Sequence, residues 1–262
     1  HHIRPIFVLF DSCWDPYPKL GPQPLPIPGV HNSRWVQSPG AEALTDPMQQ
    51  ARLEAYVKGV VGAFANDPRV LAWDIWNEPD NMNDAAYGKV ELKNKVTYVL
   101  HLLPLAFAWA RSAHPMQPLT SGVWQGTYAP FEQASEMNRI QLEESDIITF
   151  HNYGWPEDFQ HAIAELKTYD RPILCTEYMA RGVGSLFDTI LPIARKDDIG
   201  AINWGLVKGR TQTYLPWDSW QRPYVKFKPP VWFHDVFYPD GKPYREQEIE
   251  IIRHLATEKS ST

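Results

Sequence analysis

The sequence predicts an α/β fold of the (β/α)8 TIM-barrel type, formed by a single domain over residues 1–262 and N-terminally incomplete, with about six βα units. Short apolar segments alternate with amphipathic ones six times, a pattern that predicts a parallel sheet. Each apolar segment ends in polar or aromatic residues, and barrels of this type gather their chemistry at the carboxyl ends of the strands. An open doubly wound sheet is the alternative, but no glycine-rich phosphate loop supports it.

Composition limits the classes of function. The chain has 262 residues, 44% of them hydrophobic, and a net charge of −6, so it can bury a large core but has no basic run for nucleic acid or an anionic membrane. No apolar stretch reaches membrane-spanning length and no signal peptide is visible, so we expect a soluble chain, cytoplasmic or secreted. Cys13 and Cys175 lack metal-ligand spacing and are interpreted as small buried hydrophobes. We expect neither a metal nor a cofactor.

The chain is organised around Val70–Asp80, which reads VLAWDIWNEPD. This run is short, rich in bulky apolar side chains and stopped by proline, so it predicts a buried strand that delivers Glu78 at its carboxyl end. An unpaired buried carboxylate is costly, so a glutamate at this place needs a partner or a function. We expect the other strands at Arg4–Phe10, Pro118–Val123, Asp146–Phe150, Pro172–Thr176 and Gly200–Trp204.

Helical periodicity fills the intervals between these strands. In Thr45–Asn66, Thr45 is the expected N-cap, and Val90–Ala113 is expected to be interrupted or bent near Pro104. The remaining helices are expected at Glu157–Tyr169, Ser185–Lys196 and Glu246–Leu255, with a weaker one around Phe131–Met137. The connection Asp11–Leu44 carries six prolines between Pro16 and Pro28. Such a long loop forms either a stiff surface excursion or a wall of a binding cleft.

Two glutamates, Glu78 and Glu177, each follow the apolar part of a predicted strand. If the sheet closes, both side chains point into the same bowl at the carboxyl edge. Paired carboxylates without a metal-ligand cluster suit hydrolysis of a glycosidic bond: one acid protonates the leaving oxygen, and the other attacks the anomeric carbon or activates water. The plainer interpretation is that either glutamate pairs with a nearby arginine such as Arg181.

At these strand ends the sequence resembles a known group. Trp-Asn-Glu-Pro at residues 76–79, His-x-Tyr at 151–153, Thr-Glu at 176–177 and a later strand ending in Trp204 occur in this order. This pattern is similar to clan A of the glycoside hydrolases, the retaining (β/α)8-barrel clan that includes the family 5 cellulases and mannanases. The nearer likeness is to bacterial cellulase-like proteins labelled 1,4-β-xylanase or endo-mannosidase. The similarity covers most of the chain, from Ile3 to about Leu255.

The resemblance implies a role for each matching residue. Glu78 would be the general acid/base and Glu177 the nucleophile, with their carboxyl groups about 5–5.5 Å apart for retention. Asn77 would bind the sugar 2-hydroxyl, and Trp204 would form the floor of the subsite before the scissile bond. The residues expected beside the nucleophile are His151 and Tyr153, with the Tyr153 hydroxyl orienting Glu177. Trp14, Trp124 and Trp155 are further candidate substrate contacts; for these, as for Trp217 and Trp220, simple packing is an equal alternative.

The sequence departs from the family pattern at its start. Arg4–Phe10 matches the third strand of such barrels, so the first two βα units and a clan arginine have no counterpart, and Asp11–Trp14 lacks the histidine common in family 5. Two unpaired sheet edges are therefore expected, at Arg4–Phe10 and Gly200–Trp204, and such edges favour pairing with another chain. We expect a homodimer that covers them. A smaller six-stranded barrel and a fragment kept folded by its remaining core are the alternatives.

Two functions follow from these observations. The leading prediction is a retaining glycoside hydrolase that cleaves β-linked plant polysaccharides or oligosaccharides by a two-carboxylate double displacement. The alternative is a catalytically impaired relative that only binds carbohydrate, as the missing units favour. An α/β hydrolase of the Gly-x-Ser-x-Gly kind is excluded, because that motif does not occur in the sequence. The preferred sugar and linkage depend on loop geometry that the sequence leaves open.

Overall fold

The computed structural model describes residues 3–257 and divides into two compact units. Unit 1 comprises the residues up to Gln23 together with Trp35–Thr149. Unit 2 comprises Pro24–Arg34 together with the residues from Phe150 onward. That residues 1–262 form a single domain stays a prediction. No helix among residues 3–257 combines the length and the apolar character needed to cross a bilayer.

Unit 1 contains a three-stranded sheet of order β1–β2–β3, formed by β1 (Ile6–Asp11), β2 (Ala72–Asn77) and β3 (Leu119–Thr120). Both pairings are parallel, and β1 pairs with β2 from Ile6↔Ala72 to Asp11↔Asn77. Every residue of β2 is buried, as expected for a parallel strand covered on both faces. The predicted strand at Val70–Asp80 is therefore confirmed, and the register brings the carboxyl ends of β1 and β2 together.

The helices of unit 1 differ from the prediction at their amino ends. Thr45 caps no helix but ends α1 (Ala41–Thr45); Asp46 instead caps a 3₁₀ turn, η1 (Pro47–Gln49), by accepting from the amide of Met48. The long helices are α2 (Gln50–Phe64) and α3 (Lys95–Ser112), followed by η2 (Phe131–Gln133) and α4 (Glu136–Glu144). The expected interruption of α3 is wrong, because the helix continues through Pro104.

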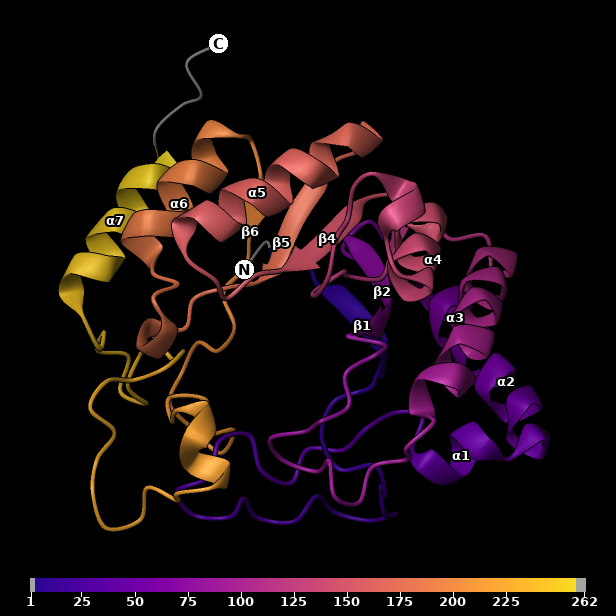
Figure 1. Cartoon of the computed structure of the whole chain (residues 1–262), viewed down its shortest axis with the longest axis horizontal. Helices are drawn as coiled ribbons and strands as arrows, with labels where there is room; N and C mark the ends of the chain where they lie inside the picture. The colour runs from indigo at the N-terminus through magenta and orange to yellow at the C-terminus, as the bar shows by residue number, and fades with distance from the viewer. Residues whose placement is uncertain (1–2, 258–262) are drawn as a thin grey trace. The chain divides into compact units, whose positions relative to one another are not determined.

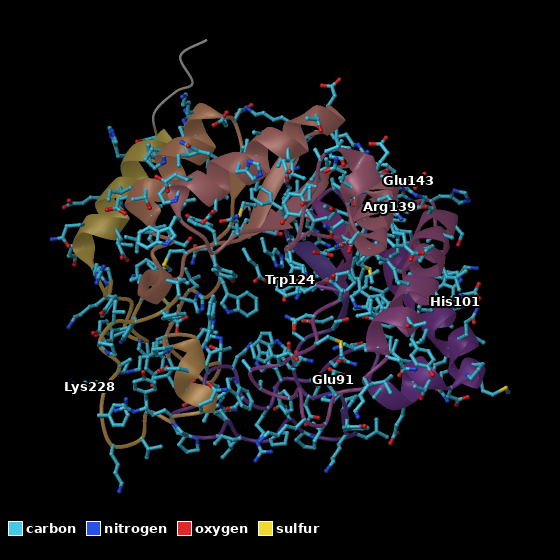
Figure 2. All side chains as sticks on the ribbon, in the orientation of Figure 1. Glu91, His101, Trp124, Arg139, Glu143 and Lys228 are labelled. Atoms are coloured by element: carbon cyan, nitrogen blue, oxygen red, sulfur yellow. The ribbon has the colours of Figure 1, made fainter. Side chains whose placement is uncertain are left out.

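The core of unit 1 lies between its sheet and its helices. Helices α2 and α3 lie side by side (Figure 1), and α2 buries Leu53, Val57 and Val61, four residues apart on one face. Trp73 and Trp76 of β2 are fully buried in the same cluster. Polar side chains occupy the outer faces, such as His101 on α3 and Glu143 on α4, which Figure 2 labels.

The second sheet has the order β4–β5–β6 and is formed by β4 (Ile148–His151), β5 (Ile173–Glu177) and β6 (Gly200–Ala201). Strands β5 and β6 belong to unit 2, which begins again at Phe150 within β4. Strands β5 and β6 pair in parallel. The helices α5 (Pro156–Leu166), α6 (Phe187–Lys196) and α7 (Glu246–Thr257) follow one another side by side (Figure 1). Short 3₁₀ turns complete the unit: η3 (Lys167–Tyr169), η4 (Arg181–Val183) and η5 (Trp217–Trp220).

These observations support the predicted fold class in part. Parallel strands alternate with helices, and the strand order within each sheet follows the chain, as in a barrel, whereas a doubly wound sheet reverses its order at a switch point. Among residues 3–257, however, the strands form two three-stranded sheets and not one closed barrel. Strands β3 and β6 are shorter than expected, with two residues each.

The proline-rich connection Asp11–Leu44 is shared by the two units. Its segment Pro24–Arg34 belongs to unit 2, where the amide of His31 donates to Ser219 Oγ and that of Gly29 to Gln212 Oε1. Residues 30–33 are buried. Residues 30–33 are therefore packed within unit 2, whereas Pro24, Leu25 and Pro28 are exposed.

Candidate functional site

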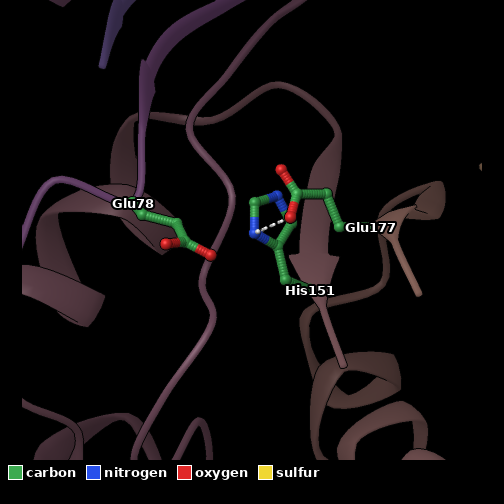
Figure 3. A group of neighbouring side chains, drawn as sticks. All are labelled: Glu78, His151 and Glu177. Carbon is green, nitrogen blue, oxygen red and sulfur yellow. Dashed lines mark ion pairs between the residues drawn. The ribbon is translucent and has the colours of Figure 1, made fainter. Parts of the chain in front are cut away.

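The first group of candidate residues lies at the carboxyl end of β2. Asn77 ends the strand and Glu78 follows it (Figure 3), with exposed fractions of 9% and 8%. The backbone of Glu78 has φ +42°, a left-handed conformation that is unfavourable for a residue with a side chain and more so before Pro79. Such strain persists only where the surrounding structure imposes it, and it is typical of functional sites.

Two side chains hold the carboxylate of Glu78 within unit 1. Its Oε2 accepts a hydrogen bond from Cys13 Sγ at 3.2 Å and another from Asn81 Nδ2 at 2.6 Å. The interpretation of Cys13 as a small hydrophobe is therefore incomplete, since the thiol is buried but donates to a carboxylate. The parallel register of β1 and β2 could have suggested this neighbour, because residue 13 is two positions beyond Asp11, which pairs with Asn77.

Asp11 is a second carboxyl group at this end of the sheet, and the sequence analysis gave it no role. Its Oδ1 accepts from the amide of Cys13 at 2.7 Å and from Asn77 Nδ2 at 3.3 Å. The pKa of Asp11 is raised to about 6, chiefly by burial and also by the charge of Glu78, while the hydrogen bonds from Cys13 and Asn77 limit the rise. Asp11 thus orients Asn77 and is electrostatically coupled to Glu78.

Two of the predicted aromatic contacts lie in loops of unit 1 near these residues. The indole of Trp124, labelled in Figure 2, donates to Asp80 Oδ1 at 2.6 Å, two residues after Glu78 in the chain. The backbone amide of Trp14 donates a hydrogen bond to Asn83 Oδ1 at 2.8 Å. Both rings are partly exposed, so each could present a face to a ligand.

The second group of candidate residues lies in unit 2, at the carboxyl ends of β4 and β5. Glu177 ends β5, and its Oε2 accepts from the Tyr153 hydroxyl at 2.8 Å. The same oxygen lies 3.6 Å from Nδ1 of His151, the ion pair drawn in Figure 3. The amide of Asn152 donates to the carbonyl of Glu177. The structure therefore brings His151 and Tyr153 together with Glu177, as the sequence predicted.

The plainer interpretation of Glu177, an ion pair with Arg181, is wrong. Arg181 binds Glu248 of α7 instead, through Nε to Oε1 at 2.7 Å and Nη2 to Oε2 at 2.6 Å. A bidentate ion pair of this kind is strong and holds the fold together.

Aromatic and histidine rings pack around Tyr153. The Tyr153 ring meets the edge of Trp217 at 5.2 Å between centroids and lies 5.6 Å from His234. Trp217 Nε1 donates to His234 Nε2 at 3.1 Å, while His234 Nδ1 contacts the carbonyl of Met179. Trp217, which the sequence analysis left open, thus supports the tyrosine that binds Glu177.

Two buried histidines were missed by sequence reasoning. His31 and His234 are 2% and 0% exposed, and their ring centroids are 5.4 Å apart. Burial lowers the pKa of His31 to about 4 and that of His234 well below its usual range. Both rings are therefore neutral near pH 7. No sequence signal marks them, since they are 203 residues apart.

The other predicted aromatic residues of unit 2 are less closely tied to Glu177. The amide of Trp204 donates to the carbonyl of Tyr178, the residue after Glu177, and its side chain is partly exposed. Trp155 is 63% exposed and its ring covers Gly184. Trp220 lies on η5 and is half-buried. Trp204 is thus held beside the end of β5, whereas Trp155 covers the turn that follows η4.

No family model matches this chain, and no curated protein matches it. Solved structures resemble it in fold. An endo-β-1,4-mannanase from Thermotoga petrophila aligns over 99% of this chain with 14% identity and a TM-score of 0.57. An endo-1,4-β-D-mannanase from Thermotoga petrophila RKU-1 aligns over 97% with 13% identity and a TM-score of 0.58. A family 10 endo-β-1,4-xylanase from Gloeophyllum trabeum aligns over 87% with 16% identity and a TM-score of 0.52.

These neighbours are glycoside hydrolases of the kinds that the strand-end motifs resemble, so the resemblance is confirmed at the level of fold. The chain spans 60% of the length of the first mannanase and about three quarters of the other two proteins, 75% and 74%. At such low identity the likeness concerns the fold, which by itself does not fix a function.

Proposed function

We propose that this protein is a retaining glycoside hydrolase that cleaves β-linked plant polysaccharides or oligosaccharides. One observation carries the proposal: Glu78 directly follows the buried strand β2, Glu177 ends β5, and polar side chains hold each carboxylate. Retention requires the two carboxyl groups about 5–5.5 Å apart across the glycosidic bond. The fold neighbours support this reaction class, since they are mannanases and a xylanase.

The two glutamates have different surroundings, and these suit different roles. Glu177 accepts the Tyr153 hydroxyl and lies beside His151, and donors of this kind stabilise the ionised form that a nucleophile needs. Glu78 is buried beside a second carboxyl group, Asp11, and accepts from Cys13 and Asn81; a buried carboxyl group fixed in this way suits the proton exchange of a general acid.

The reaction would proceed in two steps. Glu78 protonates the leaving oxygen while a Glu177 oxygen attacks the anomeric carbon, giving a covalent glycosyl-enzyme. Glu78 then takes a proton from water, which attacks the anomeric carbon and releases Glu177. Asn77 would hold the 2-hydroxyl and Trp204 the apolar face of the ring. Among the outer aromatic side chains, Trp124 suits a substrate contact best, since Asp80 fixes its indole.

The experiment is an assay of reducing-sugar release from xylan, mannan and cellulose, with aryl β-glycosides alongside. We expect activity in the wild type and none in Glu177→Gln. On aryl glycosides whose leaving groups need no acid, Glu78→Gln should give a burst of released phenol, because the first step then proceeds while the second still lacks its base. Glu143→Gln on the outer face of α4 is the matched control and should behave as the wild type. NMR of the first product should show the β anomer. Binding of a polysaccharide without turnover would instead establish the carbohydrate-binding alternative.

We also propose that two copies associate through their sheet edges. Strand β1 is the last in its sheet and exposes Phe7 and Val8 by 42% and 49%, and unpaired apolar edges favour pairing with another strand. Sedimentation velocity at micromolar concentration should give a dimer. Val8→Lys should convert it to a monomer, and a wild type that sediments as a monomer would rule the dimer out.

A further inference from the structure

The Asp11–Trp14 turn after β1 places a thiol against the proposed acid. Cys13 Sγ lies 3.2 Å from Glu78 Oε2, and Asn77 Nδ2 approaches the same sulfur at 3.8 Å. Cys13 is 7% exposed and Glu78 is 8% exposed. A hydrogen bond in so dry a place is stronger than one at the surface. The contact is therefore suited to fixing the rotamer of Glu78.

Two donors converge on one oxygen of Glu78. Oε2 accepts from Cys13 Sγ and from Asn81 Nδ2, and a carboxylate oxygen has two lone pairs in its plane. A proton added to this carboxyl group therefore goes to Oε1. The arrangement makes Oε2 the fixed oxygen of the group and Oε1 the oxygen that exchanges the proton.

The turn that carries Cys13 is held rigidly within unit 1. Lys95 Nζ donates to the carbonyl of Ser12 at 2.9 Å, and Asn83 Nδ2 donates to the same carbonyl at 3.1 Å. The Ser12 hydroxyl donates to the carbonyl of Pro79, the residue after Glu78. These contacts couple the turn to the Glu78 loop, which is the rigid support that a precisely placed group requires.

We infer that Cys13 is a positioning residue for the general acid, holding Glu78 through Oε2 so that Oε1 transfers the proton. The inference rests on the proposed function and adds a residue for which strand-end motifs give no signal. The charged or titratable groups around the thiol are Glu78, Asp11 and Lys95. The thiol donates to Glu78 and accepts from Asn77, and its sulfur forms no bond to substrate.

The kinetic experiment compares Cys13→Ala, Cys13→Ser and the wild type in their pH profiles of kcat/KM. Removing a donor from a carboxylate destabilises its ionised form, so Cys13→Ala should move the basic limb to higher pH and lower kcat about 3–10-fold, with KM little changed. Cys13→Ser keeps a donor and should return the limb to the wild-type position or below. Coincident limbs in all three proteins would overturn the inference.

A spectroscopic experiment tests the contact without turnover. Cys175 is the second of two cysteines, so a Cys175→Ser protein has one S–H stretching band, that of Cys13. Glu78→Gln in this background offers a weaker, neutral acceptor, and the band should move to higher frequency. The matched control is Glu143→Gln, which should leave it in place. If Glu78→Gln leaves the band in place, the inference is overturned. If the band moves but the wild-type protein has no glycosidase activity, the contact is supported and the proposed function is refuted.

Discussion

Lys95 in α3 has a side chain that is 0% exposed and ion-paired with Glu91, 2.6 Å away and 1% exposed. Burial lowers the pKa of Lys95, and the pairing with Glu91 opposes the change. Lys95→Met would leave the Glu91 carboxylate buried without its cation, which costs about 3–5 kcal/mol. In Lys95→Met/Glu91→Gln neither charge of the pair is left. The hydrogen bonds of Lys95 to Ser12 and Gln37 are still lost, at about 1 kcal/mol each.

Urea denaturation followed by fluorescence and circular dichroism measures the free energy of unfolding of the single and the double variant, and hence the cost of each. Lys58→Met is the matched control, because Lys58 and Glu54 have the same i,i+4 spacing but are 44% and 37% exposed; it should cost at most about 0.5 kcal/mol. The reasoning is refuted if Lys95→Met costs less than about 1 kcal/mol, or if the double variant is as unstable as the single one.

Three further changes have defined outcomes. Tyr153→Phe removes the donor to Glu177 Oε2, so kcat should fall about tenfold with KM nearly unchanged; equal kinetics would deny that hydrogen bond a role. Because the pKa of His31 falls from 6.5 to about 4 on folding, the unfolded state binds more protons between these values. Acidification from pH 6.5 to 4 should therefore remove about 3 kcal/mol of stability in denaturation curves, and His31→Gln should flatten this loss. A Cβ on Gly182 would lie 1.9 Å from the Phe233 ring, so Gly182→Ala should cost about 1–3 kcal/mol, whereas Gly59→Ala, with open space around it, should be neutral or stabilising.

Local sequence patterns predicted the elements that have strong periodicity. The strand ending at Glu78 and the helices α2, α3 and α5 lie where apolar spacing places them. The errors concern a helix cap and a proline within a helix, where several interactions compete. Asp46 accepts from Met48 and so replaces Thr45 as the cap. Pro104 lies within a helix whose face is buried among apolar residues, and such packing outweighs the loss of one backbone hydrogen bond.

The sequence by itself determined which residues end the strands, because apolar runs and the proline after Glu78 mark those ends locally. It thereby identified Glu78, Glu177, Tyr153 and His151 as candidates. Only the tertiary structure decided their partners. The thiol of Cys13 on Glu78 and the fork of Arg181 on Glu248 join residues 65 and 67 positions apart. Hydrogen bonds act over about 3 Å, and the folded backbone alone decides which distant residues come within that reach.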